Sequence, residues 1–90
     1  MRTIYKGREH LLSNVNSKDV GLAVMKVVDT LQAYPSHVQV AALSTAFVMA
    51  IDRYGVPGST ALQIAENILL LSNSKELKAA EQYMQHEWKE

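Results

Sequence analysis

The stretch from His37 to Gly55 constrains the fold of this 90-residue chain more than any other segment does. Its apolar residues recur at helical spacing in two stripes, and alanines fill much of the space between them, so a helix here has no clean polar face. The two stripes are Val40, Leu43, Phe47, Ile51 and Tyr54, and Val38, Ala42, Thr45 and Met49. A helix that is apolar on several sides needs partners around it. We therefore expect this segment to be a central helix that the rest of the fold touches.

Three other segments predict helices around it. The first has an apolar stripe from Val20 to Tyr34, follows the capping residue Asn16, and stops before Pro35. The others cover about residues 61–72 and 74–88. Gly21 lies inside the first of these helices, where glycine costs stability but allows a close approach by another element.

Cap signals mark most of the predicted helix ends. Gly55 suits the left-handed position that follows a helix. Capping boxes are expected at the helix starts. In a capping box the side chain of each of two residues accepts a hydrogen bond from the backbone N–H of the other. The residue pairs are Ser36 with Gln39, Thr60 with Gln63, and Asn73 with Glu76. The predicted fold is thus all-α, a small four-helix bundle with a central apolar second helix. It comprises one helical domain over residues 16–90 and an N-terminal arm over residues 1–15.

Composition narrows the classes of function. There is no cysteine, which excludes disulfides, thiol nucleophiles and Cys-based zinc sites and fits a cytoplasmic protein. Nine Lys and Arg balance nine Asp and Glu, so no overall basic field exists to hold nucleic acid or an anionic membrane. No apolar run approaches the length of about 20 residues that a membrane span needs. We expect no membrane partner, and we do not expect nucleic acid as the main partner.

Motifs for chemistry are missing or incomplete. His10, His37 and His86 have no partner at metal-ligand spacing, and the "HEWKE" segment lacks the second histidine of a zinc signature. The "GVPGST" turn lacks the lysine of a phosphate-binding loop. We therefore expect no catalytic residues, no metal and no cofactor, and the leading interpretation is a protein that is not an enzyme.

The supply of apolar residues is larger than one small core needs. Leu22 and Met25 lie off the main stripe of their helix, and Leu62, Leu70 and Met49 also point away from the most economical core. Such surplus often marks an interface. We expect a homo-oligomer, most simply a two-fold dimer. A further protein partner is expected to bind through Leu22 and Met25, or through Tyr83 and Trp88, in combination with the basic N-terminal arm.

Two alternatives of other classes remain open. The N-terminal arm holds the only local basic cluster, a candidate anion-binding group made of Arg2, Tyr5, Lys6 and Arg8, which could serve a nucleic-acid or nucleotide binder. A small enzyme with a site shared between subunits would use His10 or His37 with Asp52. The leading hypothesis is a non-enzymatic protein–protein interaction module, such as a self-assembling adaptor, inhibitor or assembly factor. Its size class is common among phage and bacterial accessory proteins.

Overall fold

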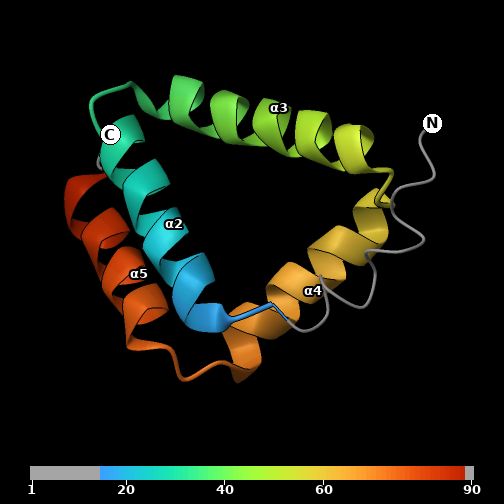
Figure 1. Ribbon diagram of the computed structural model, residues 1–90. Helices are drawn as coiled ribbons and strands as arrows, with labels where there is room; N and C mark the ends of the chain where they lie inside the picture. The colour runs from blue at the N-terminus through green and yellow to red at the C-terminus, as the bar shows by residue number, and fades with distance from the viewer. Residues whose placement is uncertain (1–14, 89–90) are drawn as a thin grey trace.

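The computed structural model describes residues 15–88, and this part of the chain is all-α (Figure 1). The four-helix, all-α fold class expected from the sequence is confirmed, and no strand occurs in residues 15–88. The helices are α2 (Ser17–Leu31), α3 (Ser36–Tyr54), α4 (Gly58–Leu71) and α5 (Lys75–Glu87).

The predicted caps at the start of α2 and the end of α3 are confirmed. The Asn16 side chain accepts from the backbone N–H groups of Lys18, at 2.8 Å, and of Asp19, at 3.4 Å. These bonds satisfy donors that the first helical turn leaves unpaired. Gly55 ends α3 in the left-handed region, with a φ of 69°, where a side chain would be strained.

The capping boxes predicted for α3 and α4 are wrong. Pro35 and Pro57 occupy the N-cap positions, and neither helix start has a side-chain cap. The Gln39 side chain, only 5% exposed, instead donates across the turn to the carbonyl of Leu31 at 2.9 Å. The Leu31 carbonyl, at the end of α2, also accepts from the Tyr34 backbone N–H at 3.0 Å, so Gln39 is its second donor.

The other two polar residues proposed for capping also act differently. The Gln63 side chain donates to Asn67 one helical turn along α4, at 3.2 Å. The cap of α5 is Ser74 and not Asn73, because the Ser74 hydroxyl accepts from the Leu77 N–H at 3.2 Å and donates to Glu76. The helix start therefore lies one residue beyond its predicted place.

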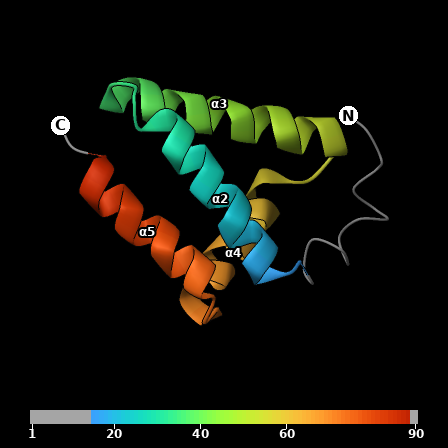
Figure 2. The same ribbon diagram turned by 60° about the vertical axis from the view of Figure 1, so that its left-hand side comes forward.

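The main packing in residues 15–88 joins α2 to α5, which lie side by side in both views (Figures 1 and 2). The two helices run parallel, because Gly21 lies against Glu76 near their starts and Val28 meets Trp88 near their ends. Val28 and Ala80 are the buried apolar residues of the described chain, at 2% and 1% exposure.

Gly21 has the role that its place in the sequence predicted. A Cβ atom added there would lie 2.7 Å from the Glu76 Cβ and 2.7 Å from the Leu77 nitrogen, closer than real Cβ atoms come. The missing side chain lets the backbone of α5 approach α2 directly.

Helix α3 is not enclosed by the other helices, which corrects the expectation of a central second helix. Helices α2, α3 and α4 form three sides of an open triangle, with α5 against the outside of α2 (Figure 1). α3 contacts α4 only slightly, near the turn where Ile51 approaches Gly58. The helix is apolar on several sides, as predicted, but the other described helices do not cover it.

Candidate interaction surface

Helices α3 and α4 expose most of the large apolar side chains of the described chain. Leu70 is 80% exposed, Leu71 is 77% exposed and Met49 is 67% exposed. The full set on these two helices is Val40, Leu43, Val48, Met49, Tyr54, Leu62, Leu69, Leu70 and Leu71. Single exposed apolar residues are ordinary, but so many large ones on two helices make these helices the candidate interaction surface. We call these nine residues the α3–α4 surface.

The same two helices carry few charges. Asp52, Arg53 and Glu66 are their charged residues, whereas the shorter pair α2 and α5 carries nine Asp, Glu, Lys and Arg. A surface with so few charges loses little hydration energy when a partner covers it. Charge depletion is also typical of the buried centre of protein interfaces.

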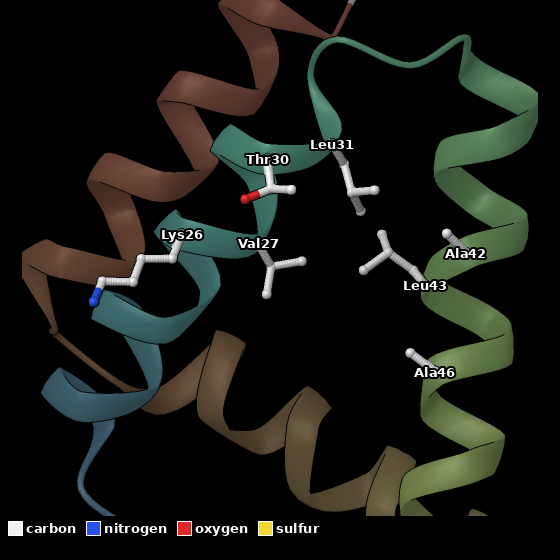
Figure 3. A pocket seen from close by; sticks show the side chains of 7 residues that line it. All are labelled: Lys26, Val27, Thr30, Leu31, Ala42, Leu43 and Ala46. Carbon is white, nitrogen blue, oxygen red and sulfur yellow. The ribbon is translucent and has the colours of Figure 1, made fainter.

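A hollow of about 360 Å³ opens between α2 and α3 (Figure 3). Leu31 of α2 and Leu43 of α3 point toward each other across it, and Val27 points into the same space, while Lys26 points away. Ala42 and Ala46 complete the wall on the α3 side. The lining is apolar except for its rim, so it fits apolar side chains rather than a polar substrate.

Two more apolar hollows lie nearby. One, of about 470 Å³, runs along α3 itself between Val38 and Met49, and Ala42 and Ala46 line it as well. The other, of about 340 Å³, lies where α2, α4 and α5 meet, lined by residues such as Val24, Ile68 and Met84. Ala42 and Ala46 thus form a low ridge with a hollow on each side of it.

The residues predicted to bind a partner lie in two different environments. On α2, Leu22 is 48% exposed and Met25 is half-buried. Tyr83 and Trp88 are half-buried and bond within the chain, because the Trp88 indole N–H donates to the Val28 carbonyl at 3.1 Å. Both aromatic residues thereby help to hold α5 on α2. Their part in binding a partner stays a prediction, as does that of Leu22 and Met25.

The Tyr83 hydroxyl donates to the Asp29 carboxylate at 2.5 Å. This bond, with desolvation and the negative charges of Asp29 and Glu87, raises the pKa of Tyr83 from 10.0 to about 12. Ionising the phenol would break the bond and place two negative charges together, so the neutral form is favoured. The contact is a structural link between α2 and α5.

Of the residues that the alternative hypotheses use, the structure describes only His37 and Asp52. Arg2, Tyr5, Lys6, Arg8 and His10 lie outside the described residues, so their predicted roles stay predictions. His37 is at the start of α3 and Asp52 near its end, about 22 Å apart at the rise of an α-helix. Within one chain these two groups cannot share a proton.

No cluster of three or more His, Asp or Glu side chains within residues 15–88 could hold a metal ion. None of the four described helices combines the length and the apolar character needed to cross a membrane. The chain matches no protein-family model, no curated protein and no solved structure.

Sequence reasoning identified the exposed apolar residues only in part. It named Met49, Leu62 and Leu70 as surplus apolar residues but predicted the partner-binding residues on α2 and near the end of α5, whereas the largest apolar exposure lies on α3 and at the end of α4. A signal was present, because residues 36–74 contain only three charged residues. The low charge of residues 36–74 favoured a helix buried at the centre of the fold. In the structure these residues are equally apolar, but most of their large apolar side chains are exposed.

Proposed function

We propose that this protein is a non-enzymatic protein–protein interaction module, acting as an adaptor, an inhibitor or an assembly factor. The observation that carries the proposal is the α3–α4 surface, a group of large exposed apolar side chains on two helices with few charges, which the other helices of residues 15–88 leave uncovered. Another macromolecule that covers this surface would gain the free energy of removing it from water.

The lining of the three hollows supports binding over catalysis. Their walls are made mainly of aliphatic side chains, and polar groups are confined to a few rim positions such as Lys26, Thr30 and Glu81. An active site needs an acid, base or nucleophile held within hydrogen-bond reach of its substrate. Shallow apolar hollows fit the side chains of a partner protein.

Photo-crosslinking in extracts of the source cells tests the proposal. A benzophenone amino acid replaces Leu70, which is 80% exposed on α4, and in a control it replaces Lys78, which is exposed on α5. Mass spectrometry then identifies each product. We expect crosslinks to protein from position 70 and few from position 78.

The absence of any protein crosslink from position 70, or equal yields from both positions, would contradict the proposal. Equal yields would mean that proteins collide with the whole surface without preference. A second copy of this chain among the products is compatible with the proposal, because self-assembly is one form that the interaction could take.

A further inference from the structure

We draw no further inference here: the strongest candidate, the apolar hollow of about 340 Å³ where α2, α4 and α5 meet, has the exposed Glu81 as its one charged lining residue within residues 15–88, and nothing in that part of the chain shows what covers it.

Discussion

The α2–α5 pair and the α3–α4 pair contain similar numbers of residues but use them in opposite ways. The α2–α5 pair carries most of the charged residues of the described chain, contains its two buried apolar residues, and is linked by Tyr83 and Trp88. The α3–α4 pair is more apolar and yet hardly packed. The difference teaches that apolar content alone does not place a helix inside a fold. Burial also requires a neighbour whose surface fits.

Helices α2 and α5 pack closely because three kinds of feature coincide along their contact. Gly21 allows close approach at one end, Val28 and Ala80 fill the middle, and two side-chain hydrogen bonds close the other end. The α3–α4 pair has no comparable set of contacts within residues 15–88. Substitutions in the two pairs should therefore differ in their effect on the free energy of unfolding.

The largest expected effect is that of Gly21→Val. The new side chain would collide with the backbone of α5 at Leu77, and we expect the free energy of unfolding to fall by about 3 kcal/mol. Urea denaturation followed by circular dichroism measures it. Ala23→Val puts the same side chain at an exposed place on the same helix and should cost less than about 1 kcal/mol. Equal losses for the two variants would remove close approach as the explanation.

A comparison of two valines tests the contrast between the pairs directly. Val28→Ala removes buried methyl groups from the α2–α5 contact and should cost about 2 kcal/mol. Val48→Ala removes the same atoms from a side chain that is 58% exposed on α3, and should cost less than about 0.5 kcal/mol. Equal effects in urea denaturation would mean that α3 is as well packed as α2, against the arrangement described above.

The side-chain hydrogen bond across the α2–α3 turn predicts a smaller loss. Gln39→Ala removes one of the two donors to the Leu31 carbonyl, which keeps its bond from the Tyr34 N–H, and should cost about 1 kcal/mol. Gln63→Ala is the control, because that exposed amide bonds only within its own helix and should cost less than about 0.5 kcal/mol. Thermal denaturation of the two variants side by side gives the difference. A neutral Gln39→Ala would show that the turn is held by its backbone alone.

The smallest effect concerns pH. The pKa of Tyr83 is raised in the folded protein, from 10.0 to about 12, so its hydrogen bond stabilises the fold fully below pH 10. That contribution is lost as pH rises from 10 toward 12. Absorbance at the phenolate band should show one of the four tyrosines ionising late, and Tyr83→Phe should remove that late step. A late step that remains in Tyr83→Phe would assign the raised pKa to another tyrosine.

Local signals in the sequence were enough to predict four helices and several of their ends. Asn16 and Gly55 act through bonds to residues only a few positions away, so neighbouring residues decide them. At the starts of α3 and α4, where the predicted caps were wrong, Pro35 and Pro57 occupy the N-cap positions in place of the expected capping boxes. Gln39 was then free to bond across the turn, which is a contact that no local pattern records.

The sequence by itself determined that the chain is helical, where most helices begin and end, and that α3 is apolar on several sides. Only the tertiary structure decided that α5 packs on α2 and that α3 stays uncovered. The physical reason is that periodicity shows which face of a helix is apolar but not which surface will cover it. Gly21 and Glu76 are 55 positions apart in the sequence and in contact in the fold. Their contact depends on the shapes of the two helix surfaces rather than on hydrophobicity.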